Sequence, residues 1–128
     1  MDNIKIEGTE TSPAVYFDFE ANTYAMGGMS YMENVKEFFG PLLDSLETHL
    51  SGLDHAEVVF DFDMAYFNSS SARVIYSLFS LMDATAENGI AVSINWHFDE
   101  DDDAIEEQGE FFSNNLKHAR FELKPAPA

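Results

Sequence analysis

The fold is decided by residues 55–98, HAEVVFDFDMAYFNSSSARVIYSLFSLMDATAENGIAVSINWHF. The spacing of the apolar residues changes twice within this stretch. Residues 55–64 alternate between apolar and polar side chains, which predicts a strand. From Ala72 to Asn88–Gly89 the apolar residues recur at helical spacing, and residues 90–98 alternate again. The helical stripe consists of Ile75, Leu78, Phe79, Met82 and Ala86. A strand, a helix and a strand in this order favour a parallel pair joined by a crossover helix.

Weaker patterns on both sides extend this unit into one α/β domain over residues 1–128. The further elements that we expect are a hairpin of strands 14–19 and 23–28, a helix over 33–52, a weaker helix over 102–118 and a short edge strand over 119–123. Pro41 marks the first turn of its helix or a kink, and 125–128 form a short Pro/Ala tail. The sequence therefore predicts a mixed sheet of four to six strands with helices packed mainly on one face.

The composition excludes several classes of function. With 45% hydrophobic residues, including 12 Phe and 5 Tyr, the chain can bury a core despite a net charge of -18. Only six Lys and Arg are present, so we expect no binding to nucleic acid and no attraction to anionic membranes. The absence of cysteine excludes a disulfide framework and thiol catalysis. No signal peptide or membrane-spanning run is evident, so we expect a cytoplasmic protein without membrane insertion.

The acidic run DEDDDAIEE, residues 99–107, is a candidate metal site that we interpret as a solvated helix start. The carboxylates at positions one, three, five and twelve of a calcium-loop template are Asp99, Asp101, Asp103 and Glu110. The template then fails, because Ala104 stands where the loop needs glycine for its sharp turn. Carboxylates in the first turn of a helix are favoured by the helix dipole, and charge runs are usually solvated. We expect no metal here.

No catalytic motif accompanies this run. The four histidines, His49, His55, His97 and His118, show no H-E-x-x-H spacing, and we interpret them as surface or boundary residues. The chain contains no G-x-S-x-G nucleophile elbow and no glycine-rich phosphate loop. We therefore expect a protein that is not an enzyme and that holds no cofactor.

The segment YFNSSSAR, residues 66–73, places one asparagine and three serines where a strand gives way to a helix. In one interpretation Asn68 or Ser69 caps a helix that begins near Ser70, an interaction worth about 1 kcal/mol. In the other interpretation one hydroxyl is phosphorylated. The free N–H groups and the dipole at a helix start stabilise phosphate, and Arg73 could pair with it. The residues alone leave both interpretations open.

Several stretches together resemble the SiaC-type regulatory phosphoproteins, small bacterial domains related in fold to anti-sigma-factor antagonists. The resemblance rests on GTETSPAVYFDF (8–19), GGMSYMENVKEFFGPLL (27–43), YFNSSSAR (66–73), INWHFDEDDD (94–103) and GEFF (109–112). These stretches cover nearly the whole chain in the order that the family has. Two positions depart from the family pattern, which commonly has Thr at the position of Ser69 and Pro at that of Met32.

The resemblance implies a phosphorylation-switched signalling protein. By position the phosphoacceptor is Ser69, and the surrounding partner surface is expected to include Tyr66, Phe67, Asn68, Ser70, Ser71 and Arg73. A dedicated serine/threonine kinase would modify the acceptor, and a metal-dependent phosphatase would reset it. The unphosphorylated form would bind and promote a diguanylate cyclase, which raises cyclic di-GMP and favours biofilm formation.

Two other functions compete with this one. An anti-sigma-factor antagonist would use a similar domain and a similar serine to bind an anti-sigma kinase. A metal-dependent enzyme would use the acidic run and the histidines, and it would lose its activity on chelation. Co-purified partners separate the first alternative from the leading hypothesis, and metal content after dialysis tests the second.

Overall fold

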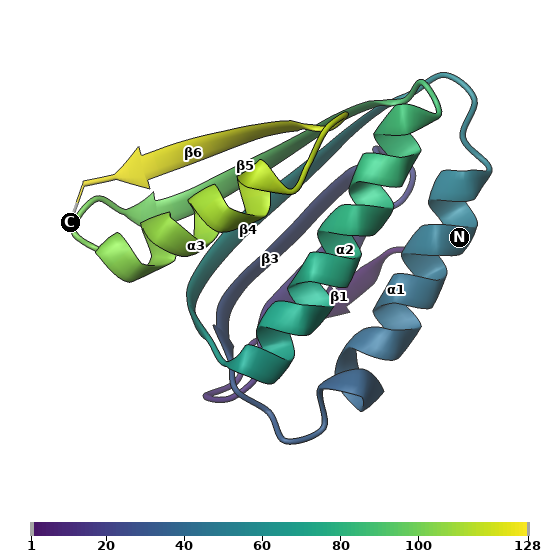
Figure 1. The fold of residues 1–128 in the computed structure, drawn as a ribbon. Helices are drawn as coiled ribbons and strands as arrows, with labels where there is room; N and C mark the ends of the chain where they lie inside the picture. Colours follow the sequence, from purple (N-terminus) through teal and green to yellow (C-terminus); the bar gives the residue numbers. More distant parts are fainter. Residues whose placement is uncertain (1, 128) are drawn as a thin grey trace.

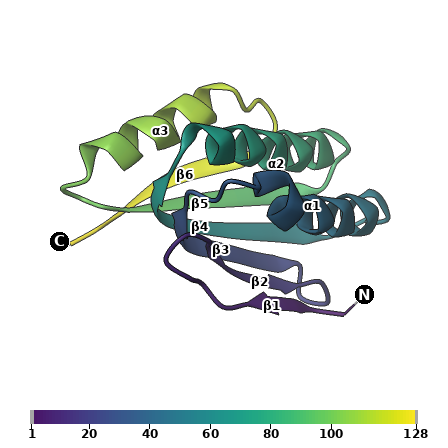
Figure 2. The ribbon, with the colours of Figure 1, turned by 90° about the horizontal axis from the view of Figure 1, so that it is seen from below.

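The computed structural model describes residues 2–127 as one six-stranded sheet and three helices (Figure 1). The elements in chain order are β1 (Ile4–Ile6), β2 (Ala14–Asp18), β3 (Thr23–Ser30), α1 (Val35–Ser51), β4 (Glu57–Phe67), α2 (Ser69–Glu87), β5 (Ala91–Asp99), α3 (Asp103–Asn114) and β6 (Arg120–Ala126). All three helices cover the same face of the sheet, and the other face is open (Figure 2). The predicted fold class is confirmed.

The strands lie side by side in their sequence order. β1, β2 and β3 are antiparallel, whereas β3, β4, β5 and β6 run parallel. The predicted strand–helix–strand unit is β4–α2–β5, in which Phe60 pairs with Ile94 and Phe62 pairs with Trp96. Within residues 2–127, none of the helices combines the length and the apolar character needed to cross a bilayer.

The core lies between the sheet and the helices, and aromatic rings fill its centre. Trp96 is buried and stacks on Phe62, with ring centroids 5.6 Å apart. The indole N–H of Trp96 donates a 3.0 Å hydrogen bond to the backbone carbonyl of Ile105 on α3. A buried tryptophan needs such an acceptor, because leaving its N–H unpaired would cost about 1–3 kcal/mol. The bond therefore fixes α3 over β5.

Several predicted boundaries were wrong at the ends of elements. β1 was not predicted, because three residues are too short to show a period; it is held by pairing with β2. β4 continues to Phe67, three residues beyond the expected end. The 125–128 tail is also wrong in part, since Pro125 and Ala126 pair with β5; an edge strand tolerates a proline that cannot donate. Residue 128 lies outside the described residues.

Pro41 lies inside α1 rather than in its first turn, because the helix already begins at Val35. The residue before a proline is disfavoured in helical geometry when it carries a Cβ atom. Gly40 has none, so glycine at this position lets the helix run through Pro41.

Gly109 provides a test of the packing between α3 and the sheet. A Cβ atom added there would lie 2.6 Å from Trp96 Nε1 and 2.8 Å from Leu123 Cδ2, inside a buried contact. We expect Gly109→Ala to lower the free energy of unfolding by about 1–3 kcal/mol, although alanine is the better helix former by about 1 kcal/mol. Urea unfolding measures the change, with the exposed Glu110→Ala on the same helix as control. A stabilised Gly109→Ala would contradict the packing.

A second test concerns Asp83 on α2, which holds the turn between α3 and β6. Its Oδ1 accepts hydrogen bonds from the backbone N–H groups of His118 at 2.8 Å, Ala119 at 2.9 Å and Lys117 at 3.1 Å. Burial acts to raise the pKa of Asp83, but these three donors outweigh it and hold the pKa below its ordinary value of 3.8. The ionised carboxylate therefore stabilises the folded chain.

We expect Asp83→Asn to be less stable than wild type at neutral pH. The native pKa of Asp83 is lower than its ordinary value. The stability advantage of the wild type is therefore complete at pH values well above 3.8, and it disappears as the pH falls through the native pKa. Unfolding free energies measured across acid pH would show the two curves converging. The exposed Asp44→Asn on α1 serves as control, and a gap that persists unchanged to low pH would contradict this account.

Candidate functional site

The start of α2 lies at the edge of the sheet where β3 and β4 both end. Asn68 is the N-cap residue, and its Oδ1 accepts a 2.9 Å hydrogen bond from the backbone N–H of Ser71. The backbone N–H of Asn68 in turn donates to the carbonyl of Ser30 at 3.0 Å. Ser69 and Ser70 are therefore the first two residues of the helix, and both are exposed. The backbone N–H groups of these two residues have no acceptor within the helix, because the first N–H groups of any helix lack a carbonyl one turn earlier.

A buried pair of hydroxyls ties this helix start to β3. Ser30 and Ser71 are fully buried, and their Oγ atoms lie 2.7 Å apart. Ser71 Oγ also donates to the backbone carbonyl of Ser30 at 3.0 Å. Because a serine has a single hydroxyl proton, the proton shared between the two side chains then comes from Ser30. The pair satisfies both hydroxyls without water.

This geometry corrects two residues of the predicted partner surface. Ser71 is buried against Ser30, and Phe67 is buried against Trp96 and Phe112 in the core. Ser71 is fully buried and Phe67 is only 9% exposed, so these two side chains offer a partner little or no surface in this conformation. The remaining predicted residues, Tyr66, Asn68, Ser69, Ser70 and Arg73, are exposed or partly exposed and lie together around the first turns of α2.

Tyr31 belongs to the same surface and was missed by the sequence analysis. Its ring meets that of Tyr66 edge to face, with centroids 6.1 Å apart, and both rings are largely exposed. The two tyrosines meet because Ser30 pairs with Phe67 at the ends of parallel strands. The carboxyl ends of neighbouring parallel strands share one edge of a sheet, and that rule could have indicated Tyr31.

Arg73 lies one helical turn beyond Ser69 and is exposed. It is the sole cation of α2, and none of the ion pairs found among residues 2–127 involves it. The guanidinium is therefore available to a phosphate on the same helix or to a group of a partner.

The acidic run serves locally as the start of α3. Asp102 is the N-cap residue, and its Oδ1 accepts a 3.1 Å hydrogen bond from the backbone N–H of Ile105. Residues 103–110 are helical, so the last eight positions of the calcium-loop template cannot wrap around an ion. No cluster of three or more metal-ligating side chains occurs among residues 2–127. That the run is a solvated surface stays a prediction.

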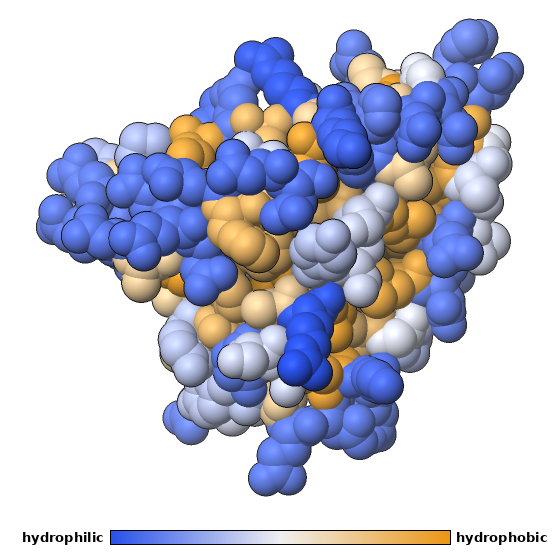
Figure 3. All heavy atoms as spheres, in the orientation of Figure 1, coloured by the Kyte–Doolittle hydropathy of each residue, from blue (hydrophilic) through white to orange (hydrophobic). Residues whose placement is uncertain are grey.

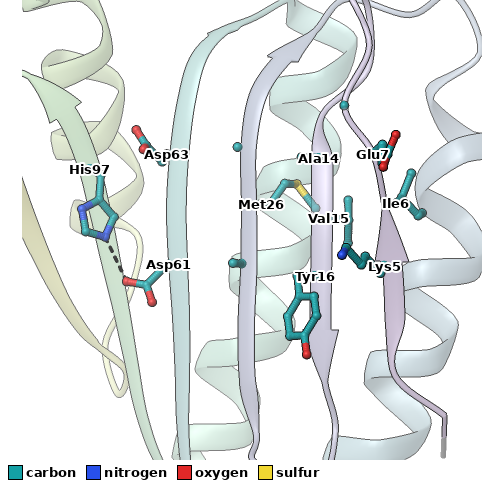
Figure 4. A pocket seen from close by; sticks show the side chains of 13 residues that line it. Lys5, Ile6, Glu7, Ala14, Val15, Tyr16, Met26, Asp61, Asp63 and His97 are labelled. Atoms are coloured by element: carbon teal, nitrogen blue, oxygen red, sulfur yellow. Dashed lines mark hydrogen bonds and ion pairs between the residues drawn. The ribbon is translucent and has the colours of Figure 1, made fainter.

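The open face of the sheet carries a second group of polar side chains (Figure 4). His97 Nε2 lies 2.9 Å from Asp61 Oδ1, to which the side-chain amide of Asn95 also donates at 3.1 Å. A shallow hollow of about 570 Å³ lies beside them and extends over Ala25 and Tyr16 to β1. It lies on the opposite face of the sheet from the helices and holds no nucleophile paired with a base.

The sequence and the structure are both similar to known proteins. The family described as SiaC family regulatory phosphoprotein matches residues 6–126. An uncharacterized protein of Pseudomonas aeruginosa is 31% identical over 112 residues, 88% of either chain. The crystal structure of apo-SiaC from Pseudomonas aeruginosa is similar with a TM-score of 0.90 at 30% identity, covering 97% of this chain and 99% of that one.

A further crystal structure shows the diguanylate cyclase SiaD in complex with its activator SiaC from Pseudomonas aeruginosa. It contains a chain that matches with a TM-score of 0.90 at 28% identity, covering 96% of this chain and 99% of that one.

The buried hydroxyl pair predicts that neighbouring serines differ sharply in their effect on stability. Ser71→Ala leaves the Ser30 hydroxyl buried without its partner, and we expect a loss of about 1–3 kcal/mol in the free energy of unfolding. Ser70→Ala removes an exposed hydroxyl from the same turn and should change stability by less than about 0.5 kcal/mol. Chemical denaturation of both variants and of the wild type measures the two changes in the free energy of unfolding. Equal effects would show that the pair does not hold the helix start.

Proposed function

The chain belongs to the SiaC family of regulatory phosphoproteins, and from this we propose that it is a non-catalytic regulator of a diguanylate cyclase, switched by phosphorylation of Ser69. The observation that carries the proposal is the exposed hydroxyl of Ser69 at the first helical position of α2, beside the buried Ser71.

The position of Ser69 suits a phosphoacceptor. The hydroxyl is exposed to a kinase, and the helix start supplies free N–H groups and the positive end of the dipole to the phosphate. Arg73 follows one turn later, about 6 Å along the helix axis, and can pair with the phosphate in a charge-assisted hydrogen bond. Of the three serines in the segment, Ser71 is excluded by its burial, which leaves Ser69 and Ser70.

The similarity to the solved complex supports a diguanylate cyclase as the partner. There, a chain of the same fold over 96% of this sequence is part of a structure of a cyclase with its activator. We propose that the unphosphorylated form of this protein binds and promotes such a cyclase. A serine/threonine kinase would then add the phosphate to Ser69, and a metal-dependent phosphatase would remove it.

Phosphorylation would weaken docking for an electrostatic reason. It adds about 1.5 to 2 negative charges to a surface that the partner must cover. Burying that dianion costs several kcal/mol unless the partner supplies compensating cations. The phosphate would also pair with Arg73, so the surface would lose its one free guanidinium.

Two substitutions at Ser69 separate the acceptor from the docking role. We expect Ser69→Ala to fold and bind the cyclase as wild type does while losing phosphate incorporation. Ser69→Asp should weaken cyclase binding about tenfold or more, equivalent to about 1.4 kcal/mol. Isothermal titration with the cyclase and mass spectrometry of the protein from cells provide the two readouts.

Ser70→Asp is the matched control, because it places the same charge on the neighbouring exposed residue of the same turn. We expect it to weaken cyclase binding much less than Ser69→Asp does. Phosphate found on Ser70 in a fully modified Ser69→Ala protein would refute the assignment of the acceptor. Equal cyclase affinity of the phosphorylated and unphosphorylated forms would refute the switch, and specific capture of an anti-sigma kinase would favour the alternative function.

A further inference from the structure

An apolar groove opens between α2 and α3, next to the start of α2. Its wall on α2 consists of Ala72, Arg73 and Tyr76, and its wall on α3 consists of Gln108, Phe111 and Phe112. Figure 3 shows hydrophobic atoms between the two helices, bordered by hydrophilic side chains. The groove has a volume of about 280 Å³. This is at or below the lower limit of ligand pockets, about 300–1,000 Å³, so the groove fits a side chain better than a cofactor.

Two aromatic rings that line the groove are exposed, and contact between apolar surface and water is unfavourable in the free protein. Phe111 is 58% exposed and Tyr76 is 47% exposed, although the chain is highly acidic and otherwise buries most of its phenylalanines. Exposed aromatic rings beside a hollow are characteristic of sites that bind protein partners, because covering them removes apolar surface from water.

The two walls of the groove differ in charge. Arg73 is the only cation on α2. On the other side, Glu107 lines an adjoining hollow together with Gln108 and Phe111, and Glu110 is exposed on the same helix. A ligand that lies along the groove therefore meets the positive charge of Arg73 on the α2 side and the negative charge of Glu107 on the α3 side.

We propose that this groove receives an amphipathic helix of the partner protein, with one large apolar side chain inserted between Tyr76 and Phe111. The helix carries an acidic residue opposite Arg73 and a basic residue opposite Glu107. Recognition of a helix through apolar anchors in a groove is a common mode of peptide binding, and charge complementarity sets its orientation. The proposal deepens the proposed function, because the groove begins one turn from Ser69.

The charge on Arg73 connects the groove to the phosphorylation site. In the unphosphorylated protein, Arg73 is free to pair with the acidic residue of the partner helix. A phosphate on Ser69 competes for the same guanidinium and repels that acidic residue. The groove keeps its apolar walls, but it loses the charge that holds the helix in place.

The test uses two probes: the diguanylate cyclase, and a fluorescent synthetic amphipathic helix with one Leu anchor, Glu on one side and Lys on the other. We expect Phe111→Ala and Tyr76→Ala to weaken both probes about tenfold or more. Tyr16→Ala is the matched control, because Tyr16 is 45% exposed on β2, at the open face of the sheet. It should leave both affinities within about twofold. Thermal melts establish that each variant is folded.

Each outcome is decisive for one claim. If cyclase binding survives Phe111→Ala and Tyr76→Ala, the groove is not the docking site, and the proposed function is unaffected. If wild type binds no cyclase, the proposed function fails, and the synthetic helix alone decides the groove: loss with Phe111→Ala supports it, and no binding overturns it. Self-association that Phe111→Ala abolishes would replace the partner helix by a second copy of this chain.

The link to Ser69 has its own control. We expect Ser69→Asp to weaken binding of the synthetic helix in the wild-type background and to have a smaller effect in an Arg73→Gln background. If Ser69→Asp weakens binding equally in both backgrounds, the claim that the bound helix places an acidic residue opposite Arg73 is overturned.

Discussion

All three helices must lie on one face of the sheet, and the rest of the structure depends on this constraint. From β3 to β6 each new strand is added on the same side of the one before, in parallel. Crossovers between parallel strands are right-handed in nearly all proteins, so successive crossovers in one direction place their helices on the same face. The core is therefore one layer between sheet and helices, and the opposite face stays open to solvent (Figure 2).

The same topology builds the candidate site. The parallel strands β3 and β4 end at one edge of the sheet, and α2 begins there. The Ser30–Ser71 hydroxyl pair and the Asn68 cap then fix the first turn of α2 by hydrogen bonds that leave Ser69 and Ser70 outside. Polar groups in this segment thus have two separate tasks: Asn68 and Ser71 hold the backbone, while Ser69 and Ser70 face the solvent.

Charge explains why a single guanidinium matters on this surface. The chain carries 24 Asp and Glu against six Lys and Arg, so a free cation next to the helix start is unusual. Arg73 lines the apolar groove and lies one helical turn beyond Ser69. A phosphate on Ser69, as we propose, would change the local field at the proposed docking surface without requiring any change of the fold.

The sequence by itself determined the β4–α2–β5 unit and the one-sided mixed sheet, whereas Ser69 as the phosphoacceptor stays a proposal that the family resemblance suggested. Those conclusions depend on local period and on residue order, which a linear chain displays directly. It could not determine β1, which exists only through pairing with β2, or the course of β6 through Pro125. The tertiary structure alone decided that Ser71 and Phe67 are buried, that Tyr31 joins Tyr66, and that Tyr76 and Phe111 flank one groove. The physical reason is that these facts depend on which side of each helix the sheet covers and on contacts between residues far apart in the chain.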